Sequence, residues 1–489
     1  MLSADVVVIG GGPAGAAAAR LLAQWDRTVV AIGRAPSRRA IAESLPPSCT
    51  KLLDALGVRA AVDAAGFVRA TGNTVQWGRA TGRRSEPFSG GDGYQVDRTR
   101  FDALLGDAAQ AAGAHIIRGA TVRSARRHDD AWLVDYDADG GPASCRARWV
   151  LDCSGRAGVV ARGGYRRAEQ AARTTAVVGV WESDAWPSED FATHTLVESY
   201  DDGWAWSVPV SPTRRYVTVM LDPRQSDVPS RDALDRAYRA ELGRTELIAD
   251  LVRGATLVES SWGCDASPYR SHRVSDDGLL LVGDAASFID PLSSFGVKKA
   301  LASAWLGAIV ANTALSDAEL SGAARDLFER REQTMYAELQ RQSAALAREA
   351  TATHDSAFWH ARTEDIPGTD VELDAAVLRG DHRVRDAFEE LKRRPAMHLR
   401  AGDTLRVVEQ AVVRGNRVVL EQHLASTAIP QGVRYCRNVD LLTITRLAPH
   451  HQQVPDLYDA YARTASVVPL PDFLGALSAL IGLEMLTFA

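Results

Sequence analysis

The hydrophobic positions near the N-terminus follow the pattern of a buried strand, a helix and a second strand. Asp5–Ile9 is rich in β-branched residues, and it is followed at once by Gly-Gly-Gly-Pro-Ala-Gly and an alanine-rich stretch through about Gln24. Thr28–Ile32 repeats the strand pattern. Continuous apolar runs of this length are typical of strands that are buried on both faces. The pattern therefore predicts a strand–turn–helix–strand unit of an α/β fold.

Three later segments extend this pattern. Gln95–Gly113 begins with a short strand-like run and continues as a helical pattern, and Trp149–Asp152 is another short strand-like run. Leu279–Val282 restores the buried-strand pattern after a long interval. Strands that alternate with helices are typical of a parallel sheet. We therefore expect a cofactor domain that is assembled from two separated stretches of the chain.

The stretch from about Arg166 to Arg270 has a different pattern, in which neighbouring residues alternate in character. Tyr216–Leu221 is an example. Such alternation predicts an antiparallel sheet with one covered face, which we expect to be the substrate platform. From about Lys298 onward the chain is predicted to be mostly helical, with several loops. The predicted organisation is a cofactor domain in two parts (1–165 and 271–312), an inserted sheet (166–270) and a helical C-terminal region (313–489).

The composition narrows the class of partner. The chain has 489 residues, of which 46% are hydrophobic, enough for two or three packed units. Its net charge of -6 provides no broad basic field, so neither nucleic acid nor a membrane surface is expected as a partner. The N-terminus lacks a basic region followed by an apolar stretch, and we expect a cytoplasmic protein. The cysteines and histidines show no metal-ligand spacing, so no metal site is predicted.

The glycines after the first predicted strand match G-x-G-x-x-G at Gly10, Gly12 and Gly15. In such a turn the first glycine permits a tight bend, the second lets a pyrophosphate approach the backbone, and the third lets the helix pack on the strand. The phosphates then face the helix N-terminus, where free amides and the helix dipole favour negative charge. The strand context raises this pattern above a chance packing turn. We therefore predict a dinucleotide site that also includes Pro13 and Ala14.

The end of the second predicted strand departs from the usual dinucleotide site. An acidic residue there normally binds the adenosine ribose, but Ile32 is followed by a glycine and Arg34. The ribose contact must come from elsewhere or from water, and Arg34 is included in the predicted cofactor site. The second half of the site is a strand that runs into a turn at Gly283 and Asp284. This acid is positioned to accept hydrogen bonds from hydroxyl groups.

Three segments resemble the class A flavin monooxygenase superfamily. They are the Gly283-Asp284 turn, Val96-Asp97-Arg98 with Phe101-Asp102, and Asp152-Cys153-Ser154-Gly155-Arg156. The resemblance implies a Rossmann-type FAD-binding domain of the glutathione reductase kind, an inserted antiparallel sheet, and contact between Asp284 and the ribityl chain. FAD is the predicted cofactor, because an enzyme that uses NAD alone is not expected to carry the second turn.

Within that superfamily the chain most resembles the flavin-dependent halogenases. Trp204–Pro209 resembles their W-x-W-x-I-P motif, Phe288–Gly296 resembles their second motif beside the flavin, and Ala42–Pro46 resembles their G-E-S-x-x-P loop. For the paired tryptophans, packing is the alternative role. The predicted site comprises Ser44, Arg98, Gly283, Asp284, Pro291, Gly296 and Val297 at the flavin, Phe67, Trp204 and Trp206 at the substrate, and Glu43 and Ser293 as candidate catalytic groups or as structural hydrogen-bonding groups.

The position that decides the reaction departs from the halogenase pattern. The family carries a lysine on the segment that Gly66–Gly72 resembles, and its amine is understood to capture or polarise hypohalous acid. Here the matching residue is Ala70, whose methyl group can neither donate a hydrogen bond nor form a haloamine. Arg69 is adjacent, but in an extended segment its side chain points to the opposite face, and a guanidinium is a poor substitute for an amine. Ser293 stands where the tryptophan-acting halogenases have an acid.

We therefore predict an FAD-dependent monooxygenase or oxidase on a halogenase-like scaffold. A flavin C4a-hydroperoxide would transfer oxygen to an electron-rich aromatic ring, an indole or a phenol, which is free or bound to a peptide or carrier. Two alternatives stay open. One is a halogenase that uses another residue, such as Lys298 or Lys299, although these lysines are expected to face solvent or the cofactor phosphates. The other is a noncatalytic FAD-binding maturation subunit.

The source of the reducing electrons is a further open point. The sequence contains no second convincing dinucleotide turn. Either NADPH reduces the flavin directly or a separate flavin reductase is a partner, and the sequence does not choose between them.

Overall fold

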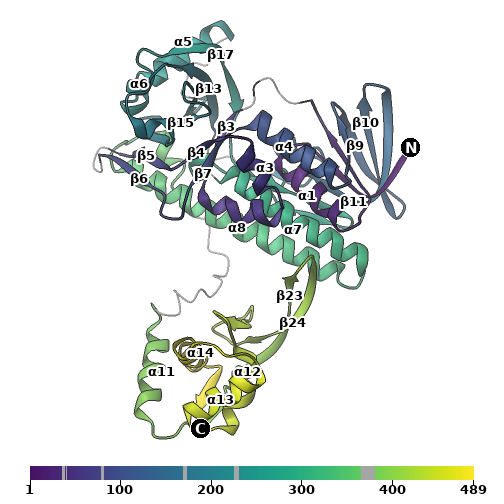
Figure 1. Cartoon of the computed structure of the whole chain (residues 1–489), viewed down its shortest axis with the longest axis vertical. Helices are drawn as coiled ribbons and strands as arrows, with labels where there is room; N and C mark the ends of the chain where they lie inside the picture. Colours follow the sequence, from purple (N-terminus) through teal and green to yellow (C-terminus); the bar gives the residue numbers. More distant parts are fainter. Residues whose placement is uncertain are drawn as a thin grey trace. The chain divides into compact units, whose positions relative to one another are not determined.

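The computed structural model describes residues 1–35, 39, 41–78, 82–168, 173–224, 231–293, 295–364 and 380–489. These divide into two compact units, Met1–Pro367 and Gly368–Ala489. The first unit contains two large β-sheets and the longest helices, and the second is a smaller α/β unit (Figure 1).

The first large sheet has the parallel core that the apolar runs predict. Its strands are β1 (Leu2–Ile9), β2 (Val29–Gly33), β8 (His115–Arg118), β9 (Thr121–His128), β10 (Ala131–Ala138), β11 (Gly141–Asp152), β19 (Ser275–Asp276) and β20 (Leu279–Leu281). The central order is β19-β20-β11-β1-β2-β8, and β1 pairs in parallel with both β11 and β2. Strand β20 comes from the distant second stretch, so this sheet is built from two separated parts of the chain.

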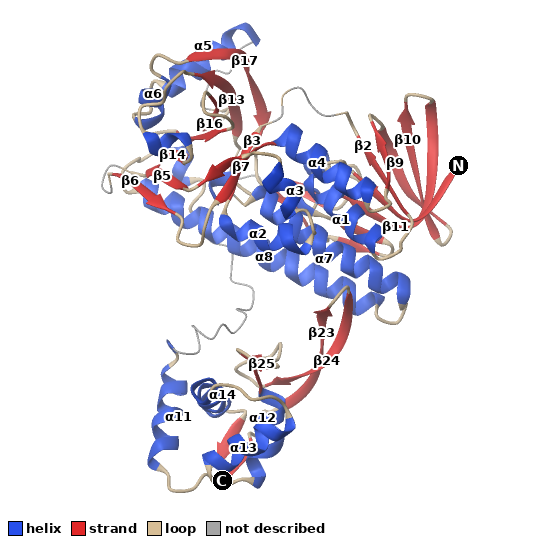
Figure 2. Ribbon diagram, in the orientation of Figure 1, coloured by secondary structure: helices blue, strands red, loops and turns tan. Residues whose placement is uncertain are grey.

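Four helices complete this part of the fold. They are α1 (Pro13–Gln24), α4 (Arg98–Ala111), α7 (Gly296–Ser316) and α8 (Ser321–Thr351). Helix α1 packs against α4 and α7, and α7 packs against α8 (Figures 1 and 2). Helix α4 begins at a capped end, because the Asp97 carboxylate accepts a hydrogen bond from the Arg100 amide at 3.0 Å. The predicted Rossmann-type α/β fold is confirmed.

Short elements connect this core to the second large sheet. A three-stranded sheet consists of β3 (Ala42–Leu45), β7 (Gly93–Asp97) and β4 (Val68–Ala70), in that order. It carries two of the segments that resemble halogenase motifs. The remaining short elements of the first unit are α2 (Thr50–Ala55), α3 (Arg59–Ala64), α9 (Ala357–His360), β12 (Arg166–Ala168), β18 (Tyr269–Ser271) and β21 (Ser287–Phe288).

The second large sheet has seven strands. In spatial order they are β17 (Thr256–Asp265), β13 (Thr175–Glu182), β16 (Arg214–Leu221), β15 (Gly203–Pro209), β14 (Thr195–Tyr200), β5 (Gly72–Gln76) and β6 (Arg83–Pro87). All neighbours are antiparallel except β14 and β5, which are parallel. The sheet thus extends beyond the expected 166–270 stretch, because it takes two strands from the first part of the chain.

Alternate side chains of this sheet point to opposite faces, as the period of two requires. On one face, Val177, Ala205 and Val219 pack into a buried cluster with Tyr238 of α5 (Arg231–Leu242) and Ile248 of α6 (Leu247–Val252). Figure 2 shows these two helices beside the strands. The residues between these positions point the other way, toward the cavity described below.

The second unit combines helices with strands that the sequence analysis does not predict. Its helices are α11 (His382–Arg393), α12 (Leu441–Leu447), α13 (Val454–Thr464) and α14 (Leu470–Gly482), and its strands are β22 (Leu399–Ala401), β23 (Arg406–Arg414), β24 (Arg417–Ala425), β25 (Tyr435–Cys436), β26 (Val439–Asp440) and β27 (Leu486–Phe488). The helices confirm the predicted helical C-terminal region, and the strands are an addition to that prediction. Strands β23 and β24 form a long antiparallel hairpin, in which all nine residues of each strand are paired.

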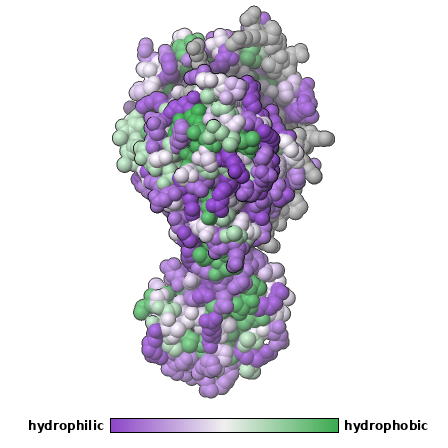
Figure 3. Space-filling view, turned by 90° about the vertical axis from the view of Figure 1, so that its right-hand side faces the viewer, coloured by the Kyte–Doolittle hydropathy of each residue, from purple (hydrophilic) through white to green (hydrophobic). Residues whose placement is uncertain are grey.

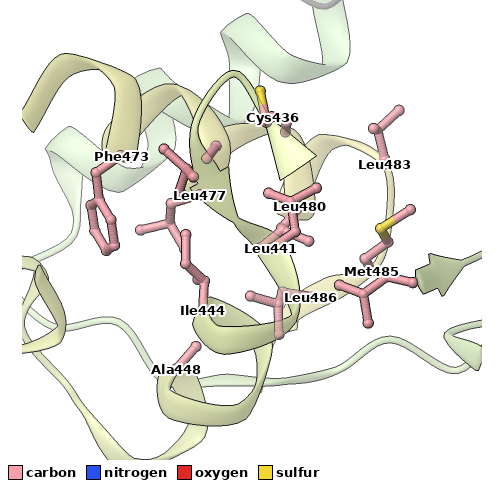
Figure 4. Packing of buried hydrophobic residues seen from close by; sticks show 14 of the residues in the cluster. Cys436, Leu441, Ile444, Ala448, Phe473, Leu477, Leu480, Leu483, Met485 and Leu486 are labelled. Atoms are coloured by element: carbon pink, nitrogen blue, oxygen red, sulfur yellow. The ribbon is translucent and has the colours of Figure 1, made fainter. Parts of the chain in front are cut away.

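The second unit has a hydrophobic core of its own. Figure 4 shows Leu477 and Leu480 of α14 packed with Leu441 and Ile444 of α12, next to Met485. All of these side chains are almost completely buried. Helix α14 therefore lies in the core of the second unit.

The outer surface is mostly polar on the face that Figure 3 shows, where hydrophobic residues form small separate patches. None of the helices in the described ranges is both long enough and apolar enough to cross a membrane.

Candidate active site

A cavity of about 700 Å³ lies in the first unit and is lined by both large sheets and the helices between them. Its walls come from the turn after β1, the end of β2, strand β3, helix α4, the turn after β11, the inner face of the seven-stranded sheet and the start of α7. The predicted site residues that line it are Gly10, Gly12, Pro13, Ala14, Arg34, Glu43, Ser44, Arg98, Trp204, Trp206, Asp284, Pro291, Gly296 and Val297.

The glycine turn has the geometry that a pyrophosphate needs. Gly10 has a φ of +120°, and a Cβ there would lie 2.3 Å from the Cys153 carbonyl oxygen. A Cβ on Gly15 would lie 2.0 Å from the Gly10 carbonyl oxygen, so this glycine lets α1 pack directly on the turn. Gly12 is the N-cap of α1, which has no side-chain cap and no acidic residue in its first turn. The uncapped amides at this helix end therefore fit an anionic phosphate group.

A partly buried cluster of charged side chains lies beside this turn. Arg98 donates to Glu43 at 2.5 Å and to both carboxylate oxygens of Asp102 at 2.8 and 2.9 Å. Burial raises the pKa of Glu43, and Arg98 opposes the rise. Burial also acts to lower the pKa of Arg98, but the two carboxylates outweigh it, so this pKa is raised. The arginine is therefore held as a cation in a fixed position, with Glu43 as a carboxyl group whose proton affinity is increased.

Side chains of α7 form hydrogen bonds with the second cofactor turn, at Gly283 and Asp284. Ser303 accepts a hydrogen bond from the Gly283 amide at 2.8 Å, and the Lys299 ammonium donates to the carbonyl oxygens of Gly283 at 3.0 Å and Ser287 at 2.5 Å. Lys299 is 4% exposed and lies 3.4 Å from the Asp284 carboxylate. The expectation that Lys299 faces solvent or phosphates is therefore wrong, because its ammonium group satisfies buried carbonyl groups instead.

The inner face of the seven-stranded sheet forms an aromatic wall. The rings of Trp204 and Trp206 are stacked, with centroids 4.8 Å apart and planes at 26°. Phe288 lies at the same cavity, and the Arg156 guanidinium lies 4.1 Å from the centre of its ring. Stacked aromatic side chains of this kind suit a flat aromatic ligand.

Some predicted site residues lie away from this wall. Phe67 packs edge-on against Phe101 of α4, with ring centroids 6.2 Å apart, and it is not among the residues that line the cavity. Gly15 and Gly283 do not line the cavity. Gly15 lies close to the Gly10 carbonyl oxygen, and Gly283 lies close to Ala300 of α7. The side chain of Ser293 falls outside the described part of the chain.

Ala70 of β4 is fully buried and is not itself among the residues that line the cavity. Ala70 pairs with Gly93 and Val68 pairs with Gln95, so these residues share one face of the small sheet. Gln95 donates a hydrogen bond to Thr195, which lines the cavity. Arg69 points the other way, where its guanidinium lies 4.5 Å from the centre of the Tyr94 ring.

The structure adds cavity residues that the predicted site does not include, among them Asp102, Arg118, Arg156 and Thr195. The sequence does contain a signal for Asp102, because an acidic residue four positions after Arg98 on a helix lies on the same face as the arginine. Thr195 had none beyond its place in an alternating strand.

Comparison with known proteins identifies the chain's relatives. Residues 3–311 match the family described as FAD binding domain. The tryptophan 2-halogenase of Chondromyces crocatus is 29% identical over 341 residues, a match that covers 67% of this chain and 65% of the halogenase. The chain thus spans less than two thirds of that relative.

Two solved structures share the fold. The flavin-dependent halogenase CmlS superimposes with a TM-score of 0.80 at 22% identity, over 99% of this chain and 96% of CmlS. The peptidyl tryptophan dihydroxylase QhpG does so with a TM-score of 0.67 at 22% identity, over 95% of this chain and 96% of QhpG. At these identities the likeness establishes the fold.

The family match covers more than half of the chain and includes both turns that build the cofactor side of the cavity. The residues at those turns fit the pyrophosphate and ribityl portions of FAD. The chain belongs to the FAD binding domain family.

Proposed function

We propose that this protein is an FAD-dependent monooxygenase that transfers oxygen to an electron-rich aromatic ring. The observation that carries the proposal is the methyl side chain at position 70. Ala70 shares a strand face with Gln95, which contacts Thr195 of the cavity wall. A lysine on this face would bring an amine toward the cavity, whereas alanine supplies none. Among the described residues, the cavity wall includes five arginines and no lysine.

The chain's own residues would position the reactants. Reduced FAD, when bound, supplies the oxygen-activating chemistry. The turn at Gly10–Gly15 would hold the pyrophosphate against α1, and Asp284 would accept hydrogen bonds from the ribityl hydroxyls. The apolar sheet face would hold the aromatic ring and limit the entry of water. Oxygen transfer to an activated ring depends on positioning more than on a dedicated base, which suits this arrangement.

The aromatic wall supports an aromatic substrate. The stacked rings of Trp204 and Trp206 offer a flat surface to an indole or a phenol. The names of the halogenase and the dihydroxylase reported above specify tryptophan and peptidyl tryptophan. We infer a substrate of indole or phenol type that is free or bound to a peptide or carrier. Either a separate flavin reductase or direct reduction by NADPH would supply the electrons, and the experiment below supplies a reductase.

The decisive experiment is product analysis. The FAD-loaded protein is supplied with a flavin reductase, NADH, air and bromide, together with a panel of indoles, phenols and pyrroles. Mass spectrometry is expected to find a product that has gained one oxygen atom and no bromine. A brominated product from the unmodified protein would overturn the proposal.

Halogenation is the second candidate, and the Trp204–Pro209 motif together with the similarity to a tryptophan 2-halogenase favours it. Ala70→Lys separates the two, with Ala70→Met as a matched control of similar length and no charge. Both variants carry the same cost of overfilling a buried position. We expect brominated product from the lysine variant alone. Equal bromination by the unmodified protein would mean that another group supplies the halogenating function.

A further inference from the structure

The sheet face at the cavity has very little hydrogen-bonding capacity. The side chains that it contributes to the lining are Ala176, Thr195, Val197, Trp204, Trp206, Val208 and Met220. Thr195 is the one hydroxyl among them, and its residue is 3% exposed. The other polar groups among these side chains are the indole N–H groups of Trp204 and Trp206. A hydroxyl in a wall with so few polar groups can orient a ligand, because a polar ligand atom placed against the apolar part of the wall loses its hydrogen bond to water without replacement.

Gln95 fixes how this hydroxyl can act. The Gln95 amide is fully buried, and its Nε2 atom donates to the Thr193 carbonyl oxygen at 2.9 Å and to the Thr195 hydroxyl oxygen at 3.1 Å. Because a carbonyl oxygen only accepts, the contact with Thr193 sets which end of the amide is the nitrogen. Both amide hydrogens are then used. The Thr195 oxygen is therefore an acceptor toward Gln95.

The remaining hydrogen of the Thr195 hydroxyl lacks a good acceptor in the described residues. The nearest is the Gln95 Oε1 atom at 3.4 Å, which exceeds the usual range of about 2.5–3.0 Å for such bonds. The Gln95 amide already donates to the Thr195 oxygen through Nε2, so a second bond from the Thr195 hydroxyl to Oε1 of the same amide would be long and poorly aligned. A ligand oxygen in the cavity would offer it a shorter and better aligned bond.

We propose that Thr195, oriented by Gln95, is the specificity-determining donor that binds an oxygen atom on the aromatic substrate. This favours a phenol over an indole, because a phenolic oxygen accepts a hydrogen bond whereas an indole N–H donates one. The phenol would lie with its ring on the Trp204 and Trp206 side of the cavity and its oxygen at Thr195. The inference rests on the proposed function, since it assumes that the aromatic substrate occupies this cavity.

Ligand binding tests the inference without turnover. The full chain loaded with oxidised FAD is titrated with p-cresol and with toluene, which has the same ring and no oxygen, and binding is followed by calorimetry and by the flavin absorbance. We expect p-cresol to bind more tightly than toluene by about fivefold, the value of one net hydrogen bond. Thr195→Val, which keeps the shape and removes the hydroxyl, should abolish this preference, and Thr195→Ser should retain it.

Thr71→Val is the matched control. Its hydroxyl bonds to Thr193 at 2.7 Å and lies outside the cavity lining, so its loss should leave the preference for p-cresol unchanged. The FAD affinity of each variant reports whether the site is still folded. If Thr195→Val binds FAD normally and still prefers p-cresol, the role of Thr195 is overturned while the proposed function stands. If neither aromatic probe binds the unmodified protein, the proposed function fails and this inference fails with it.

Discussion

Glu332 on α8 is a carboxyl group that is 3% exposed and has no hydrogen-bond partner of ordinary geometry in the described residues. Burial raises its pKa to about 7, and Lys299 and the Ser303 hydroxyl oppose the rise. The folded protein therefore holds this proton at a pH where the unfolded chain, with an ordinary value of 4.5, has lost it. Stability from this group is complete below about pH 4.5 and falls as the pH rises toward 7.

Glu332→Gln should remove that pH dependence, because the amide stays neutral. The unmodified protein is expected to lose up to ~3 kcal/mol between pH 4.5 and pH 8 through this group, and the variant should be the more stable of the two at pH 8. Thermal unfolding at both pH values measures the difference. Glu338→Gln, on the exposed side of the same helix, is the control. Identical pH slopes in the protein and the Glu332 variant would contradict the assignment.

Alanine at two glycine positions of the cofactor turn should have different effects, one on the stability of the apoprotein and the other on the affinity for FAD. Gly10→Ala places a Cβ 2.3 Å from a backbone oxygen at a φ of +120°, so the turn itself must break and the protein should lose stability even without FAD. Gly12→Ala meets nothing closer than 3.7 Å. It should leave the apoprotein stable but weaken FAD binding by about tenfold or more, because its methyl group occupies the phosphate position. Apoprotein melting and FAD titration separate the two effects, and equal melting temperatures would contradict the first.

At the scale of elements, α7 supports the cofactor turn through the side chains of Ser303 and Lys299. Lys299→Met removes the donor that bonds to the carbonyl oxygens of Gly283 and Ser287. Leaving these buried acceptors without a partner should cost about 3 kcal/mol and loosen the turn that presents Asp284. We expect a lower melting temperature and weaker FAD binding.

Lys298→Met is the matched control for this prediction. The Lys298 ammonium lies 4.6 Å from the centre of the Phe295 ring and is partly exposed, so its loss should change little. If the two variants bind FAD equally well, the supporting role of Lys299 is wrong. These variants also bear on the alternative in which Lys298 or Lys299 acts in halogenation. Loss of bromination in either variant would be informative only if the unmodified protein brominates.

The elements that the sequence predicts well are those specified by local patterns. Strands β1 and β2, helix α1 and the Gly10–Gly15 turn depend on neighbouring residues, and the structure has them close to the predicted bounds. The hairpin of β23 and β24 also had a local signal, since Gly415-Asn416 separates two runs rich in valine. The prediction of a mostly helical region overlooked it.

Contacts between distant segments could not be predicted in the same way. Lys299 was expected to be outside the core, because a lysine is rarely buried unless its ammonium finds acceptors, and the acceptors here come from a turn that tertiary packing brings to it. Thr195 and Gln95 are 100 residues apart. Nothing in either local sequence marks the pair, since only the meeting of β7 with β14 brings them together.

At the scale of the whole molecule, cofactor binding and the C-terminal core belong to different units. Every residue that lines the cavity lies between Ile9 and Ala300, inside the first unit. The second unit has a separate hydrophobic cluster that includes Phe473, which is fully buried and packs against Tyr458 and Tyr461.

This separation predicts that a core defect in the second unit leaves FAD binding intact. Phe473→Ala should destabilise that unit by about 3–5 kcal/mol, because a large buried ring is replaced by a cavity. Calorimetry is expected to show one transition moving to lower temperature while a second, which follows the loss of flavin fluorescence quenching, stays in place. The control is Phe101→Ala, in the core of the first unit at α4, which should shift the flavin-linked transition instead. Release of FAD from the Phe473 variant at the temperature where the second unit melts would show that the two cores are coupled.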